Sequence, residues 1–211
     1  DPLSFKNKEL SGKQIEKQLS EEGIETDKPI ICQVSRFDKW KDHEGVIKIF
    51  REVRKKIPCK LVLIGSMAQD DPEGQGIYES ILRKASGEKD IILIHRSNNT
   101  LVNALQRASA VVLQKSYKEG FGLTVSEALW KGTPVVASDV GGISQQIING
   151  KNGFLLKPDD FKGFTSCIIK LLRNHKLRNR MGKFGKEHVR KNFLITRHLH
   201  DWIKILSKSL K

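Results

Sequence analysis

The fold of this chain is decided by the stretch Glu119-Gly120-Phe121-Gly122-Leu123-Thr124-Val125-Ser126-Glu127, in which a glycine-flanked turn leads into a helix-forming segment. Just before it, residues 110–114 form a short β-branched run, so the local order is strand, loop, helix. Gly120 and Gly122 can adopt positive φ and let the backbone approach a ligand closely. The first N–H groups of the helix lack intrahelical partners and carry the positive end of its dipole, so the stretch predicts a phosphate-binding loop.

The same stretch carries two carboxylates, Glu119 in the loop and Glu127 about one turn inside the helix. A carboxylate would repel a phosphate, because both groups are anionic. We therefore assign both side chains to hydroxyl groups, which a sugar has in number. Together the loop and its carboxylates predict a ligand that combines phosphate with a sugar.

On both sides of this stretch, short apolar runs alternate with amphipathic segments of helical period. Strands are predicted at 30–34, 61–65, 91–94, 110–114, 134–137 and 153–156. Helices are predicted at 10–22, 46–57, 77–85, at 101–108 with Asn99 or Thr100 as the cap, after the loop at 119–122, and at 161–174, 177–191 and 195–210. Nearly all-apolar strands separated by helices indicate a parallel sheet covered on both faces. The predicted fold class is α/β, a Rossmann-like doubly wound parallel sheet with extra C-terminal helices, which binds ligands at the carboxyl ends of its strands.

The composition fits one domain, with 211 residues of which 38% are hydrophobic. No run approaches the roughly 18 apolar residues that a membrane span needs, and residues 1–20 are charged, so we expect a cytoplasmic protein that does not enter a membrane. The three cysteines form no CxxC pair, which favours buried thiols over a metal or catalytic role. The acidic pair Asp70-Asp71 favours a turn over a metal site, because Pro72 and Gly74 follow it.

The net charge of +14 suggests nucleic-acid binding as a different class of function, since nucleic-acid-binding proteins show such an excess of basic residues. The basic residues are densest at 51–60 and 173–191, where they alternate with apolar residues at helical spacing. Solvated helix faces have this pattern. We expect an anionic small molecule rather than nucleic acid, and keep a non-enzymatic nucleotide- or nucleic-acid-binding module as an alternative.

Several motifs together resemble a known family. The Glu-x7-Glu spacing at 119–127, Gly-Thr-Pro-Val-Val at 132–136 and Asp-Val-Gly-Gly at 139–142 resemble the nucleotide-sugar-binding half of retaining glycosyltransferases of the GT-B fold, the family that contains sucrose and trehalose synthases. The resemblance covers about residues 28–205. The stretches 36–42, 65–74 and 114–116 resemble the trehalose synthase branch, which joins glucose to a nucleotide-activated glucose.

The resemblance implies roles for the cations after the first strand and for the two glutamates. Arg36 and Lys41 match the family's Arg-x4-Lys pair, which would stabilise the charge that gathers on a diphosphate leaving group. Glu119 would lie near the 3-hydroxyl of the donor sugar, and Glu127 would accept hydrogen bonds from the ribose. In the family the acceptor attacks from the leaving-group side with the phosphate as base, and no residue of this half is a nucleophile.

The resemblance also implies how the rest of the donor is bound. Arg96 follows the third strand, where family members contact the base. No obligatory cofactor or metal is implied, Mg²⁺ is optional, and nucleoside diphosphate glucose is a substrate. Backbone N–H groups of the loop and the helix start would contact the sugar and the phosphate: Gly120, Phe121, Gly122, Leu123 and Thr124.

The resemblance further implies a domain organisation. Residues 1–28 are expected to be a linker segment and residues 29–211 the donor-binding domain, with the N-terminal acceptor-binding domain absent from this chain. We therefore expect the chain to bind a nucleotide-sugar without transferring glucose, and we leave a homodimer open. A transferase of the sucrose or glycogen type and a glycosyl phosphorylase are the enzyme alternatives, because the acceptor is chosen by the other half.

Overall fold

A computed structural model of the chain describes residues 1–66 and 73–209. Within these ranges the strands form one six-stranded parallel sheet of order β3-β2-β1-β4-β5-β6. The strands are β1 (Ile30–Val34), β2 (Lys60–Gly65), β3 (Ile91–His95), β4 (Val111–Gln114), β5 (Val135–Ser138) and β6 (Gly153–Leu156). The predicted doubly wound parallel sheet is confirmed.

Strand β1 lies at the centre of the sheet and all its residues are buried. Its Ile31 is in register with Leu61 of β2 on one side and Val111 of β4 on the other. The chain therefore runs outward from β1 to β3 and then returns to start again at β4. Ligands of such sheets bind at the carboxyl ends of the strands where the order reverses, which here is between β1 and β4.

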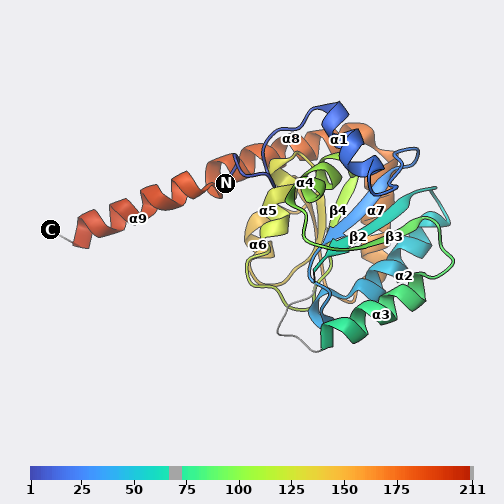
Figure 1. The fold of residues 1–211 in the computed structure, drawn as a ribbon. Helices are drawn as coiled ribbons and strands as arrows, with labels where there is room; N and C mark the ends of the chain where they lie inside the picture. Colours follow the sequence, from blue (N-terminus) through green and yellow to red (C-terminus); the bar gives the residue numbers. More distant parts are fainter. Residues whose placement is uncertain (67–72, 210–211) are drawn as a thin grey trace.

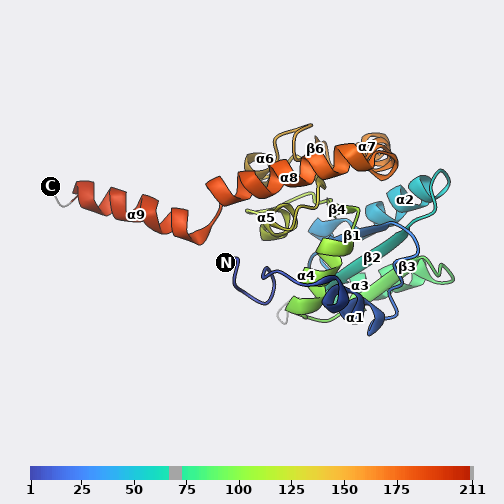
Figure 2. The ribbon, with the colours of Figure 1, turned by 90° about the horizontal axis from the view of Figure 1, so that it is seen from above.

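Helices flank both faces of the sheet (Figures 1 and 2). They are α1 (Gly12–Ser20), the 3₁₀ helix η1 (Lys39–Lys41), α2 (His43–Arg54), α3 (Glu73–Ala85), α4 (Asn99–Ala108), α5 (Leu123–Trp130), α6 (Ile143–Gln146), α7 (Phe161–Arg173), α8 (His175–Asn192) and α9 (Ile195–Ser209). Phe50 of α2 and Phe164 of α7 belong to one buried cluster, and Leu105 of α4 and Val125 of α5 belong to the other. Both clusters include residues of the strands, so the sheet has an apolar core on each face.

The structure corrects several predicted helix starts. Helix α2 begins at His43, before the first periodic apolar residue, because the Asp42 side chain accepts a hydrogen bond from Gly45 N at 3.0 Å. The cap of α4 is Asn98, whose Oδ1 accepts from Leu101 N at 3.0 Å, and not Asn99 or Thr100. The first turns of these helices are polar, so the spacing of apolar residues does not reveal where the helices begin.

The N-terminal segment packs on the domain. Helix α1 is closed by a reciprocal hydrogen-bonded box between Ser11 and Gln14 and lies against α4. Leu19 and Ile24 are buried in the same apolar cluster as α4. Helix α1 and the residues after it thus form part of the surface of the domain, packed against α4.

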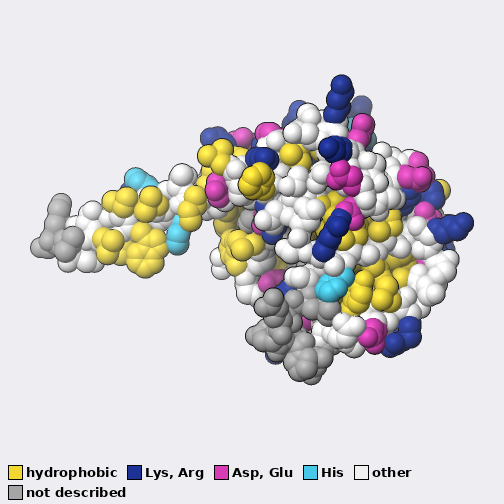
Figure 3. Space-filling model, viewed as in Figure 1, with side chains coloured by type: hydrophobic (Ala, Val, Ile, Leu, Met, Phe, Trp, Pro, Cys, Tyr) yellow, Lys and Arg dark blue, Asp and Glu magenta, His cyan; other side chains and the backbone are white. Residues whose placement is uncertain are grey.

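Helix α9 extends away from the body of the domain (Figures 1 and 2). None of its described side chains is buried, and Trp202, Ile205 and Leu206 are about half exposed, which makes the projecting helix conspicuously apolar in Figure 3. No helix in the described part of the chain has both the length and the apolarity needed to cross a bilayer.

The cysteines are free thiols. Cys32 and Cys59 are buried, as predicted, and Cys167 is half-buried. Burial raises the pKa of Cys32 to about 12 and that of Cys59 to about 11, so both stay protonated at neutral pH. Their chemistry is that of small apolar side chains.

Candidate functional site

Two of the predicted site residues meet at the carboxyl edge of the sheet. The Lys41 ammonium lies 2.6 Å from Glu119 Oε2, although the residues are 78 positions apart in the sequence. Both side chains are largely shielded from solvent. Gln114, at the end of β4, donates to the same Glu119 oxygen at 3.0 Å. The other oxygen, Glu119 Oε1, accepts from Gly120 N at 3.1 Å. A ligand phosphate that binds Lys41 would therefore lie beside the Glu119 carboxylate, which can accept from a sugar hydroxyl through the lone pair that these contacts leave.

A buried polar network holds the backbone of Lys41. Gln33 of β1 donates to Lys41 O at 2.7 Å and accepts from Lys115 N at 3.0 Å. The fully buried ammonium of Lys115 pairs with Asp42 and lies 4.5 Å from the centre of the Phe161 ring. Asp42 is the one non-glycine residue with positive φ, 36°, among those the structure describes. Such a backbone persists only where its surroundings hold it in place, which these contacts do.

Sequence reasoning missed this network. In the sequence, Lys115 and Asp42 stand out only as members of motifs that resemble the trehalose synthase branch. The available signal was the position of Gln114 and Lys115 directly after the apolar run at 110–113, at the edge of the sheet where ligands bind. Which partner would compensate the buried charge could not be inferred, because Asp42 is remote in sequence.

The glycine loop turns into α5 at Gly122. Gly122 precedes α5 with a φ of 78°, whereas Gly120, which we also expected to be able to adopt positive φ, does not do so. No side chain caps the start of α5, so the helix dipole faces the loop. Gly142 N donates to Gly120 O at 2.6 Å, which fastens the loop to the segment after β5.

The remaining loop residues differ in exposure and partners. Phe121 and Leu123 are 40% and 66% exposed. The Thr124 hydroxyl donates to Gln114 Oε1 at 2.7 Å, so it is linked to Glu119 through the Gln114 amide. Thr124 therefore supports the orientation of Gln114, while its backbone N–H lies in the first turn of α5.

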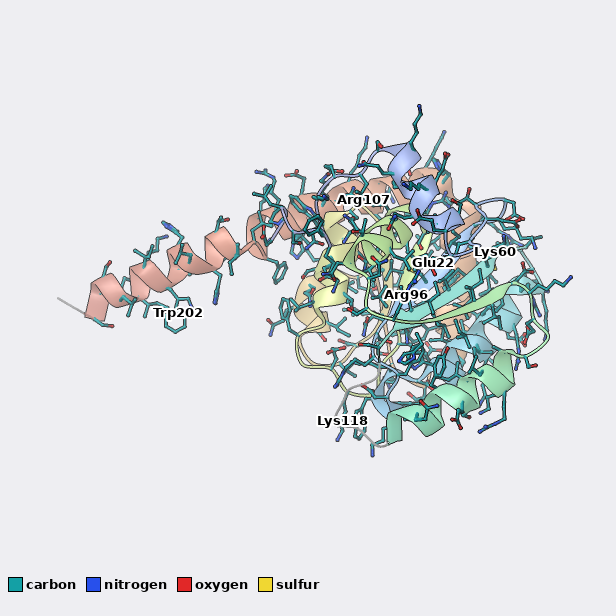
Figure 4. All side chains as sticks on the ribbon, viewed as in Figure 1. Glu22, Lys60, Arg96, Arg107, Lys118 and Trp202 are labelled. Atoms are coloured by element: carbon teal, nitrogen blue, oxygen red, sulfur yellow. The ribbon has the colours of Figure 1, made fainter. Side chains whose placement is uncertain are left out.

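The other predicted charged residues have partners outside the Lys41–Glu119 pair. Arg36 is 60% exposed and lies 3.4 Å from Asp38 Oδ2. Glu127 Oε1 lies 3.1 Å from Lys6 Nζ. Arg96 follows β3 and pairs with Glu22 of the N-terminal segment, as the two labelled side chains in Figure 4 show. Arg96 and Glu127 thus both contact residues 1–28, and neither is joined by a direct contact to the pair Lys41–Glu119.

A buried histidine lies two residues from Lys41. His43 is buried with Nε2 3.0 Å from Ser35 Oγ, and burial lowers its pKa to about 4. It is therefore neutral at physiological pH and adds no positive charge next to Lys41. Within residues 1–66 and 73–209 no group of three His, Cys, Asp or Glu side chains could hold a metal ion, and Asp70 and Asp71 lie outside these ranges.

Gly141 offers a direct test of the loop. Its φ is 52°, and a Cβ there would lie 1.9 Å from Glu119 O, whereas a Cβ on Gly150, φ 79°, meets nothing within 4 Å. We expect Gly150→Ala to lower the free energy of unfolding by about 1 kcal/mol, the cost of positive φ. Gly141→Ala should cost about 3 kcal/mol or more, because the clash adds to that strain. Urea denaturation of both variants measures the difference, and equal losses would show that the loop moves aside freely.

Comparison with known proteins identifies the family. The sequence profile of the "Glycosyl transferases group 1" family matches residues 14–188. The chain is 46% identical to the trehalose synthases of Pyrococcus horikoshii, over 98% of this chain and 50% of that protein, and of Rubrobacter xylanophilus, over 100% and 51%. It is also 33% identical to the trehalose phosphorylase of Grifola frondosa, over 75% of this chain and 24% of that protein. The chain thus spans about half the length of the trehalose synthases it matches.

Solved structures show the same fold. A sucrose-phosphate synthase from Thermosynechococcus elongatus superposes with a TM-score of 0.80 at 23% identity, over 92% of this chain and 49% of that one. HepE of Anabaena, solved in complex with UDP-glucose, superposes with a TM-score of 0.80 at 20% identity, over 94% and 54%. These neighbours are GT-B glycosyltransferases, and in this chain the motif at 119–127 runs from the loop after β4 into the start of α5. The chain belongs to the group 1 glycosyltransferases.

Proposed function

We propose that this chain is the donor-binding domain of a retaining glucosyltransferase of the cytoplasm, which transfers glucose from a nucleoside diphosphate glucose to glucose and so forms trehalose. The observation that carries the proposal is the contact of Lys41 with Glu119 beside the glycine loop. It sets a cation for phosphate, a carboxylate for sugar hydroxyls and the start of α5 side by side. A nucleotide-sugar carries its phosphates directly beside the hydroxyl groups of its sugar, so it could contact all three at once.

Each residue then has a task at a stated part of the donor. Arg36 and Lys41 donate to the diphosphate, and the N–H groups of 120–124 contact the phosphate and the sugar. Glu119 accepts from the 3-hydroxyl of the sugar. Glu127 accepts from the ribose through Oε2, which is buried and has no hydrogen-bond partner in the described part of the chain. Arg96, at the end of β3, contacts the base.

In the proposed reaction the bond between the anomeric carbon and the diphosphate oxygen breaks, and its electron pair leaves with the diphosphate. Arg36 and Lys41 stabilise that developing charge, which is greater in the transition state than in the bound donor. The acceptor hydroxyl forms the new bond on the same face of the sugar and gives its proton to the departing phosphate. Configuration is thereby retained without a nucleophile from this chain.

The acceptor is proposed from the trehalose synthases alone, at 46% identity. The similarity to a trehalose phosphorylase favours a second candidate on the same scaffold, in which inorganic phosphate takes the place of the nucleotide. The two candidates differ in whether a ribose is bound. Recognition of the ribose therefore separates them.

We expect Glu127 to be coupled to the ribose diol. Loss of the diol should weaken binding to the wild type by roughly 1.5–3 kcal/mol, because hydrogen bonds to charged groups contribute that much. Binding to Glu127→Ala should hardly change. Titrating a nucleoside diphosphate and its 2′,3′-dideoxy analogue against both proteins gives the coupling energy, which should be well above about 0.5 kcal/mol.

Glu52→Ala is the matched control, because Glu52 is an exposed helical glutamate on α2 that pairs with Lys55. It should leave both affinities unchanged. Additive losses in the Glu127 cycle would refute the ribose assignment, and failure of the wild type to bind any nucleoside diphosphate would favour the phosphorylase.

A further inference from the structure

Residues 5–8, here called the N-terminal strap, are tied to helices α4 and α5 by their backbone carbonyls. The fully buried Asn103 side chain of α4 donates to Phe5 O at 3.0 Å and to Lys8 O at 2.8 Å. Trp130 Nε1 of α5 donates to Asn7 O at 3.2 Å. Carbonyls bound by side chains of two helices hold an irregular segment in one conformation, since each buried donor would otherwise lose its partner.

Two basic side chains also donate hydrogen bonds to the strap. Arg107 of α4, labelled in Figure 4, donates to Asn7 O at 3.2 Å and to Lys8 O at 3.0 Å. Lys131, just after α5, donates to Asn7 Oδ1 at 2.9 Å. The strap is therefore positioned by α4 together with α5, the helix that carries Glu127.

The strap delivers one side chain to the candidate site. Lys6 Nζ lies 3.1 Å from Glu127 Oε1, and both side chains are mostly shielded from water. Glu127 Oε2 stays buried and without a hydrogen-bond partner among the described residues. A buried carboxylate oxygen without a donor is costly, so its retention points to a ligand that supplies one.

We propose that Lys6 is a positioning residue of the nucleotide site: it holds Glu127 Oε1 so that Oε2 is aimed at a ribose hydroxyl. The inference rests on the proposed function, because it takes Glu127 to be the ribose acceptor. It adds that the site extends into residues 5–8, which precede the range 14–188 matched by the family profile. Ribose recognition thereby depends on the position of the N-terminal strap, and a displacement of the strap would change the affinity for the nucleotide.

The test compares Lys6→Met with Lys13→Met. Lys13 lies in the first turn of α1 and is exposed, so its variant removes the same charge from the same segment without touching Glu127. The probes are UDP, ADP and GDP, followed by the 2′,3′-dideoxy form of whichever binds tightest to the wild type. Isothermal titration gives the affinities, and thermal unfolding confirms that the variants are folded.

We expect Lys6→Met to weaken nucleotide binding by about threefold to tenfold, as loss of one partly buried ion pair does. The affinity ratio between the nucleotide and its dideoxy form should also shrink, because Glu127 would no longer be held toward the diol. A merely structural role for Lys6 would lower thermal stability without changing that ratio. Lys13→Met should match the wild type in both quantities.

Two results would overturn the inference while leaving the proposed function intact. Lys6→Met could bind with wild-type affinity and ratio, which would make the ion pair incidental. It could also bind more tightly, which would show that Lys6 competes with the ribose for Glu127. Absence of binding by the wild type to all three nucleotides would instead refute the proposed function, and this inference with it.

Discussion

The purified 211-residue chain is expected to bind a nucleoside diphosphate glucose but to form no disaccharide from it and glucose. The chain spans about half of the trehalose synthases that it matches, and transfer requires the acceptor to be held against the donor. Holding two reactants in place is worth on the order of 10⁵ M or more in effective concentration, so its loss should abolish measurable transfer. Water exclusion by closure of the second half would be lost as well.

The measurement is disaccharide formation by the chain alone and by a protein that includes the second half, at equal concentration and saturating donor. The control is a titration that measures nucleotide binding by the isolated chain and so shows that the chain is folded and able to bind the donor. Trehalose formation by the chain alone at rates on the order of 1 s⁻¹ or faster, which are typical of enzymes, would contradict the prediction.

Removal of either cation that we propose to bind the diphosphate should have the second largest effect. We expect Arg36→Ala or Lys41→Ala in the complete enzyme to lower kcat/KM on the order of 10² to 10³, because each is a preorganised donor to charge that develops in the transition state. Lys41 is placed by its contact with Glu119 and by the Gln33 bond to its backbone. Most of its loss should fall on kcat, since the interaction strengthens as the bond breaks.

The matched control is Lys48→Ala, which removes an exposed cation from α2, the helix that follows Lys41. It should change kcat/KM by less than about twofold, because an exposed charge away from the ligand contributes little. Unchanged kinetics in both Arg36→Ala and Lys41→Ala would show that neither cation takes part in transfer.

Much of the fold could be predicted because its signals are local. Apolar runs such as Ile30–Val34 and Val111–Gln114 alternate with helical periods, and this order alone implies a parallel sheet covered on both faces. Helix starts at His43 and after Asn98 were misplaced because polar first turns have no apolar period. The short helices at 39–41 and 143–146 were missed for the related reason that a single turn shows no periodicity.

For the candidate site, local sequence supplied the residues whose roles in binding and transfer we propose. The Glu-x7-Glu spacing, the glycines at 120 and 122 and the cations at 36 and 41 are short-range patterns, and all lie within the residues 14–188 that the family profile matches. Spacing could not indicate that Thr124 donates to Gln114 or that Arg96 pairs with Glu22. These partners are set by where whole strands and segments pack.

The sequence by itself determined the parallel α/β architecture, the loop that starts α5 and the family of the chain, because backbone period, glycine and motif spacing act within a few residues. Only the tertiary structure decided which charges meet: Lys41 with Glu119, Lys115 with Asp42, and Lys6 with Glu127. Each pair joins residues more than 70 positions apart. Coulombic attraction between side chains depends on their separation in space, which is fixed by the strand order and the packing of the strap and not by their separation along the chain.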